Sequence, residues 1–214
     1  MTCLRPIVLA STSAHRRALV ARLGIAFETA DPALDEDPYK QRGLLPEQMV
    51  AALSEAKARA LVKTRPDALL IGSDQCAEID GRVLGKPGGR QQAVSQLALL
   101  AGRTHRLLTG LCLLDAVSGE ATMAVDVHAL TMRALHRSEI ERYVDREQPY
   151  DCAGGYKIEG AGIALFESIQ GEDHTAIVGL PMMRLVCSYA RSSSSAMICR
   201  YPVPEPCPRS VLPT

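Results

Sequence analysis

Tryptophan is absent from this 214-residue sequence, and phenylalanine occurs only twice. A chain of this length can bury a substantial core as one domain, and that core must rely on aliphatic side chains. A net charge is lacking too, because 24 basic residues balance 24 acidic ones. The overall charge therefore gives no indication of binding to nucleic acid or to an anionic membrane, and any basic site must be local.

Long apolar runs are also missing. No stretch reaches the length of a transmembrane helix, and the start of the chain lacks the apolar segment of a secretory signal. The seven cysteines are scattered, odd in number and without a CxxC pair. This pattern is typical of reduced thiols and argues against a disulfide framework or a zinc site. We therefore expect a cytoplasmic protein that binds neither membranes nor nucleic acid.

The stretch with the most chemical information is residues 6–17. An apolar run over 7–10 predicts a buried strand, the hydroxyl residues at 11–13 predict a turn, and 14–23 predict a helix. Two interpretations are open. Ser13 can be an ordinary helix cap with the arginines in solvent, or the turn can be an anion site in which Arg16 joins the free N–H groups of the helix.

The rest of the pattern predicts further strands and helices in an α/β domain. A proline at position 46 and a capping pattern at 138–141 mark two helix starts. Strands are expected over 25–29, 68–72, 103–114, 120–132 and 163–169, and helices over 46–63, 90–101, 138–146 and from 179 onward.

Several charged residues can serve either structure or chemistry. The acids at 35–37 can form a solvated loop, or they can offer oxygen ligands to Mg²⁺ or Mn²⁺. Lys57 lies on an apolar helix stripe, where its ammonium can reach water or point into a phosphate site. Asp74 directly follows the apolar run 68–72, and α/β sheets bind ligands beyond such strand ends. Lys86 lies in a tight glycine–proline loop.

Read together, these motifs resemble the Maf family of nucleoside triphosphate pyrophosphatases, and within it the branch that hydrolyses 7-methyl-GTP. The likeness runs from about residue 9 to about residue 186. It implies a mixed, twisted sheet flanked by helices around a ligand cleft, similar to inosine triphosphate pyrophosphatase, and often a homodimer. The motifs that carry it are 6–17, 35–38, 55–58, 73–75 with 85–87, and the glycine-rich 154–160.

The resemblance also implies roles for individual residues. Asp74 would accept the proton of the water that attacks the α-phosphorus, which releases a nucleoside monophosphate and pyrophosphate. Glu36 and Asp74 would hold a divalent metal ion, Mg²⁺ or Mn²⁺. The residues that would bind the phosphates of the substrate are Ser11, Ser13, Arg16, Lys57 and Lys86. The residues that would select the base are His15, Gln75 and Glu159, of which Gln75 could both donate and accept hydrogen bonds.

Two departures from the family pattern leave alternatives open. Ala14 stands where the motif usually has proline, and His15 stands where the 7-methyl-GTP branch has a larger aromatic residue. One alternative is the sister activity on dTTP and UTP, whose members usually carry arginine and threonine at the positions of His15 and Gln75. The other is a nucleotide-binding regulator of septum formation that is not an enzyme.

The end of the chain changes in composition. Residues 192–195 are all serine, and proline recurs four times between 202 and 208. We therefore expect a catalytic domain over residues 1–190 and a tail over 191–214. The tail is interpreted either as a disordered extension or as the product of a shifted reading frame.

Overall fold

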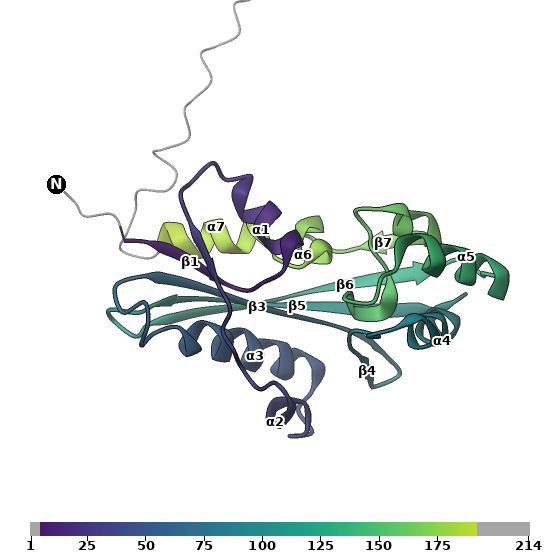
Figure 1. The fold of residues 1–214 in the computed structure, drawn as a ribbon, viewed down its shortest axis with the longest axis horizontal. Coiled ribbons are helices and arrows are strands. Elements are labelled where there is room, and N and C mark those ends of the chain that lie inside the picture. The colour runs from purple at the N-terminus through teal and green to yellow at the C-terminus, as the bar shows by residue number, and fades with distance from the viewer. Residues whose placement is uncertain (1–4, 192–214) are drawn as a thin grey trace, which may run out of the picture.

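The structure, a computed structural model, describes residues 5–191 of the chain. The predicted tail over 191–214 therefore lies, apart from residue 191, outside the described residues. Within the described range, one mixed sheet carries helices on both faces (Figure 1). No helix of this range is both long and apolar enough to cross a membrane.

The sheet has the strand order β2-β1-β3-β5-β6-β7, and a short β4 pairs with β3. Strand β1 is parallel to both β2 and β3, whereas the pairs β3–β5, β5–β6 and β6–β7 are antiparallel. The strands are β1 (Ile7–Ala10), β2 (Glu28–Ala30), β3 (Leu69–Ile79), β4 (Arg82–Leu84), β5 (Thr104–Asp115), β6 (Ala121–Met132) and β7 (Phe166–Gln170).

Helices α3 and α4 cover one face of the sheet, while α1, α6 and α7 cover the other (Figure 1). Side chains of β3 alternate between these layers: Leu70 packs with Ala58 of α3, and Ile71 packs with Leu19 of α1. The helices are α1 (Ala14–Ala21), α2 (Asp37–Lys40), α3 (Pro46–Ala60), α4 (Arg90–Leu100), α5 (Arg137–Glu147), α6 (His174–Val178) and α7 (Met182–Arg191), with 3₁₀ turns at Ala153–Gly155 and Ala161–Leu165.

The predicted mixed α/β fold is confirmed, but several boundaries were wrong. The second strand covers Glu28–Ala30 rather than 25–29, and α3 ends at Ala60 rather than at 63. Strand β3 does not end at residue 72 and continues to Ile79, because β5 pairs with it along this whole stretch. Helix α5 begins one residue early and is capped by His136, whose N–H donates to Glu139 at 2.9 Å. The last strand begins only at Phe166, since a 3₁₀ turn precedes it.

Helix α3 approaches the sheet closely because two neighbouring strands carry glycine beneath it. A Cβ atom at Gly72 would lie 2.0 Å from the carbonyl oxygen of Ser54, and one at Gly110 would lie 2.4 Å from that of Val50. Both distances are far too short for a real contact. The two glycines therefore set the depth of α3, and with it the position of Lys57 on that helix.

This packing predicts that Gly72→Ala destabilises the protein. The added methyl group forces α3 away from the sheet, and such overpacking typically costs about 1–3 kcal/mol. Urea denaturation would measure the change in the free energy of unfolding. Gly85→Ala is the matched control, because nothing lies within 4 Å of a Cβ atom at that position. Equal stability of the two variants would contradict the proposed role of Gly72.

Candidate active site

The site is built around a gap in the pairing of β3. Strand β1 pairs with β3 only from Leu69 to Ile71, and β4 pairs with it only from Ala77 to Ile79. Between them, β3 has a strand neighbour on the β5 side alone. Side chains from the flanking helices satisfy backbone groups in this stretch. Arg16 Nη1 donates to the carbonyl of Ser73 at 2.8 Å, and the N–H of Asp74 donates to Ser54 Oγ at 2.9 Å.

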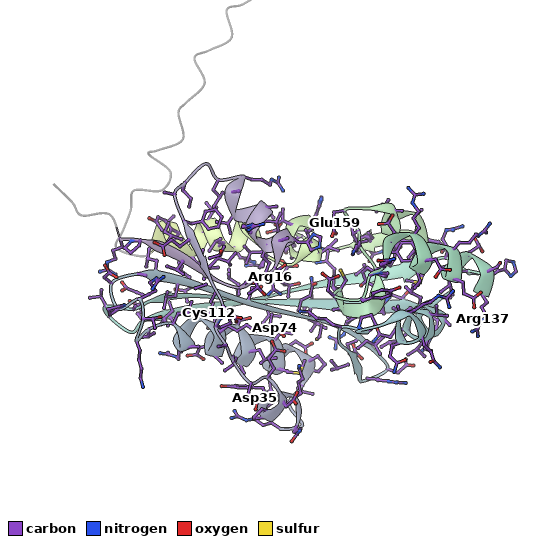
Figure 2. All side chains as sticks on the ribbon, in the orientation of Figure 1. Arg16, Asp35, Asp74, Cys112, Arg137 and Glu159 are labelled. Carbon is purple, nitrogen blue, oxygen red and sulfur yellow. The ribbon has the colours of Figure 1, made fainter. Side chains whose placement is uncertain are left out.

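Asp74 therefore lies inside a strand rather than just past its end, which corrects the position expected from the sequence. The alternation of the strand sends Asp74 towards α3 and its neighbours Ser73 and Gln75 towards α6. Figure 2 shows Arg16 and Glu159 on the α1 side of the sheet and Asp74 on the α3 side. Ligand groups from both helical layers thus reach the same open stretch of β3.

A cleft of about 1130 Å³ opens at this gap. Its walls come from the turn after β1, the segment before α2, α3, the middle of β3 and the loops at residues 85–86 and 151–159. All the residues to which the sequence assigned a role line this one cleft, so the fold brings the separate motifs together; their individual roles stay predictions. These residues are Ser11, Ser13, His15, Arg16, Glu36, Lys57, Asp74, Gln75, Lys86 and Glu159.

Lys57 links two carboxylates across the cleft. Its Nζ lies 2.5 Å from Asp74 Oδ1 and 2.8 Å from Glu36 Oε1. Lys57 is only 8% exposed and Asp74 only 9%, so water screens this contact weakly. Of the two interpretations of Lys57, the geometry therefore supports the one in which the ammonium points into the site. Although burial alone would raise the pKa of Glu36, hydrogen bonds from Lys40 and Lys57 lower it to about 2.

The turn after β1 caps α1 through Ser13, as one interpretation of its sequence expected, whereas the anion site of the other interpretation stays a prediction. Ser13 is the N-cap of α1 and accepts from the N–H of Arg16 at 3.4 Å, and it also lines the cleft. The N–H of Ser13 in turn donates to Ser11 Oγ at 3.2 Å. Capping and ligand binding are therefore compatible at this position.

Arg16 is fixed by two backbone carbonyls. Its Nη1 donates to Ser73 and its Nε donates to Gly179 at 2.8 Å. Burial lowers the pKa of the guanidinium, while the nearby carboxylates of Asp74 and Glu36 raise it. No hydrogen bond joins Nη2 to the described residues. This nitrogen can donate to an anion in the cleft without any movement of the side chain.

The far end of the cleft carries the residues predicted to select a base. His15 Nδ1 lies 3.0 Å from Glu159 Oε1. Gln75 is more restricted than the sequence indicated, because its Nε2 donates to Thr109 Oγ1 at 2.9 Å and to the carbonyls of Ala176 and Ile177. Its carbonyl Oε1 is left as the atom for a ligand, and it can only accept.

Sequence reasoning missed several residues that shape the site. Lys40 Nζ lies 2.8 Å from Glu36 Oε2. Their spacing of four residues could have predicted this pair on a helix, but the neighbouring prolines indicated a loop instead. Ser54 was visible as a polar residue on the inward face of α3. Tyr156 lines the cleft, and its hydroxyl shares a hydrogen bond with His105 Nε2 at 2.9 Å. The sequence spacing of these two residues does not predict that contact.

The donor set fits a divalent metal ion of the Mg²⁺ or Mn²⁺ class. Glu36 and Asp74 both contact the same ammonium, so their oxygens face a common point, and carboxylate oxygens are the ligands that these ions take. Asp35 and Asp37, which the structure also describes, do not line the cleft. Among the three acids at 35–37, Glu36 is thus the one placed to hold a metal ion in the cleft.

The lowered pKa of Glu36 predicts a pH-dependent contribution to stability. The folded state holds the carboxylate down to about pH 2, against an ordinary pKa of 4.5. The stabilisation is therefore complete above 4.5 and is lost as the pH falls towards 2. Glu36→Gln should lower the free energy of unfolding by about 1–3 kcal/mol near neutral pH and by somewhat under half as much near pH 3.

Urea denaturation at both pH values would measure this difference. Glu55→Gln is the control, because its pair with Arg59 spans 2.7 Å on the exposed face of α3, the helix that carries Lys57. We expect that change to alter the free energy of unfolding by about 0.5 kcal/mol or less at either pH. A Glu36→Gln effect that is the same at both pH values would contradict the assignment of the ion pair.

Comparisons with known proteins identify the family. A profile of the family described as Maf-like protein matches residues 6–191. Proteins named 7-methyl-GTP pyrophosphatase include one from Nitrosococcus oceani, 46% identical over 84% of this chain and 89% of its own. Another from Pseudomonas aeruginosa is 45% identical over 84% of this chain and 93% of its own, and one from a Polaromonas species is 44% identical over 90% and 87%. The chain therefore belongs to the Maf-like protein family.

Proposed function

We propose that this protein hydrolyses 7-methyl-GTP to 7-methyl-GMP and pyrophosphate, which removes a modified nucleotide from the cell. The observation that carries the proposal is the contact of the buried Lys57 with both Asp74 and Glu36, beside the fixed guanidinium of Arg16. Cations and carboxylates in one cleft suit phosphoanhydride hydrolysis, in which cations hold the phosphates and a base activates water. The name shared by relatives at 44–46% identity supports the substrate.

The cations of the cleft can receive a triphosphate from several directions. Arg16 offers its unpaired Nη2, and the exposed Lys86, which makes no ion pair with the described residues, reaches from the opposite loop. Lys57 can exchange a carboxylate partner for a phosphate oxygen. Each such charge-assisted contact is worth about 1.5–3 kcal/mol when it is kept from bulk water.

Asp74 is placed to accept a proton from the attacking water. Its N–H is held by Ser54 and its Oδ1 by Lys57, so the carboxylate has a fixed position on a rigid strand. When Lys57 turns to the phosphates, Asp74 Oδ1 is left free to accept a hydrogen bond from water. A bound Mg²⁺ or Mn²⁺, held by Glu36 and Asp74, would supply additional positive charge to the phosphate oxygens.

The far end of the cleft suits a positively charged base. A 7-methylguanine ring carries a positive charge, which the Glu159 carboxylate can balance while it accepts from the N–H groups of the base. The ring of His15 can stack on the base, and Gln75 Oε1 can accept from it or from the sugar. The homodimer and the cytoplasmic location expected from the sequence belong to the same proposal and stay predictions.

Replacement of the proposed base tests the mechanism. We expect Asp74→Asn to lower turnover about 10²–10⁴-fold, because the amide cannot accept the proton of water. Pyrophosphate release from 7-methyl-GTP would be measured, with circular dichroism to check the fold. Asp67→Asn, on an exposed turn before β3, is the control and should retain full activity. Near-full activity of a folded Asp74→Asn variant would remove Asp74 from the mechanism.

A nucleotide panel tests the substrate. We expect the protein to hydrolyse 7-methyl-GTP faster than GTP, dTTP or UTP. His15→Trp should sharpen this preference, because indole offers the strongest aromatic face to a cation, worth about 0.5–2 kcal/mol.

Two results of this panel would overturn the proposal. Faster hydrolysis of dTTP or UTP by the unmodified protein would assign it to the sister activity. Binding of nucleotides without any release of pyrophosphate would make it a binding protein.

A further inference from the structure

A second group of possible metal ligands lies at the base end of the cleft. A ring nitrogen of His15, a carboxylate oxygen of Asp151 and Sγ of Cys152 all lie within 4.8 Å of one another. His15 comes from the first turn of α1, whereas Asp151 and Cys152 come from the turn after α5. All three line the cleft. The fold thus brings together donors that the sequence separates by most of the domain.

The surroundings of His15 favour a role as a ligand. Its Nδ1 lies 3.0 Å from Glu159 Oε1, and its Nε2 has no hydrogen-bond partner among the described residues. A histidine that binds a metal commonly donates its other ring N–H to a carboxylate, which orients the ring and fixes the tautomer. With Nε2 as the ligand atom, Glu159 would do this for His15 through Nδ1.

The other two donors already contact each other. Cys152 Sγ donates to Asp151 Oδ1 at 3.5 Å, and Lys157 Nζ lies 4.0 Å from the same carboxylate. Burial, and then the neighbouring Asp151, raise the pKa of the Cys152 thiol to about 12. The thiol is therefore protonated in the metal-free protein, and a bound metal would have to replace its proton.

We propose that His15, Asp151 and Cys152 form a binding site for a zinc-class divalent ion, distinct from the Glu36–Asp74 carboxylates. One nitrogen, one oxygen and one sulfur donor form a set that suits Zn²⁺ and not Mg²⁺ or Mn²⁺. Three protein ligands leave the fourth tetrahedral position open to the cleft. The sequence does not indicate this site, because it has no CxxC pair and because the cysteine and histidine of the site come together only in the folded chain.

An ion at this position would change the function of the cleft. It would occupy His15, which the proposed function uses to contact the base, and it would fill the space beside Glu159. Zinc should therefore inhibit the hydrolysis of 7-methyl-GTP. This inhibition rests on the proposed function, whereas the binding of the ion does not.

Cobalt titration of the full-length protein tests the binding directly, because a thiolate ligand gives a cobalt charge-transfer band in the near ultraviolet. The background protein carries serine in place of Cys3, Cys187, Cys199 and Cys207, so that Cys152 and the two buried cysteines Cys76 and Cys112 remain. We expect the band to saturate at one cobalt ion per chain. It should disappear in the background that also carries Cys152→Ser.

Zinc competition for the bound cobalt gives the affinity of each variant. Glu159→Gln should weaken zinc binding by about 10–100-fold, as the loss of a partner of a ligating histidine commonly does. Absence of the band at stoichiometric cobalt, or its persistence after Cys152→Ser in a folded protein, would overturn the site.

Hydrolysis assays then test the inhibition. Zinc should slow pyrophosphate release by the background protein, and Cys152→Ser should remove this sensitivity, which is measured for each protein as the ratio of its rate with zinc to its own rate in zinc-free buffer. A cobalt band without zinc inhibition would overturn the inhibitory role and retain the site. A cobalt band in a protein that releases no pyrophosphate would retain the site and overturn the proposed function.

Discussion

The buried contact of Lys57 with Asp74 and Glu36 is the interaction around which the cleft is arranged. Taking three charges out of water is costly, and their mutual attraction offsets this cost only where the geometry is close. The distances of 2.5 and 2.8 Å meet that condition. They depend on how deeply α3 packs, and therefore on the glycines of β3 and β5 beneath it. A backbone feature with no chemistry of its own thus fixes the charged centre of the site.

The same centre explains why the cleft is open where it is. A complete strand beside the middle of β3 would cover Asp74, whereas β1 and β4 both end before they reach this stretch and leave it open to the cleft. The exposed backbone is then satisfied by Arg16 and Ser54 instead of by another strand. The sheet loses a few ladder hydrogen bonds and gains a concave surface with ligand groups from both helical layers.

Much of this arrangement could be predicted from the sequence, because apolar periodicity marks the strands and helices and local motifs mark the cleft. The predictions that failed depend on contacts between residues that are far apart in the sequence. Polar residues at 73–75 resembled a strand end, since nothing local shows that Ser54, Arg16 and Gly179 would satisfy them. Gln75 looked free to donate because its acceptors are distant in the sequence, one on β5 and two about a hundred residues away on α6. The proximity of His15 to Cys152 likewise exists only after folding.

Arg16 also has a consequence for the order in which the chain can assemble. Its guanidinium is held by Ser73 and by Gly179, so the first helix is anchored partly by the segment between α6 and α7. During synthesis, the N-terminal part of the cleft therefore cannot be completed until residues near the end of the domain have left the ribosome. A nascent chain that has already made β1 to β6 still lacks one of the two carbonyls that orient this arginine. The Arg16 end of the cleft is thus among the last features that a growing polypeptide can complete.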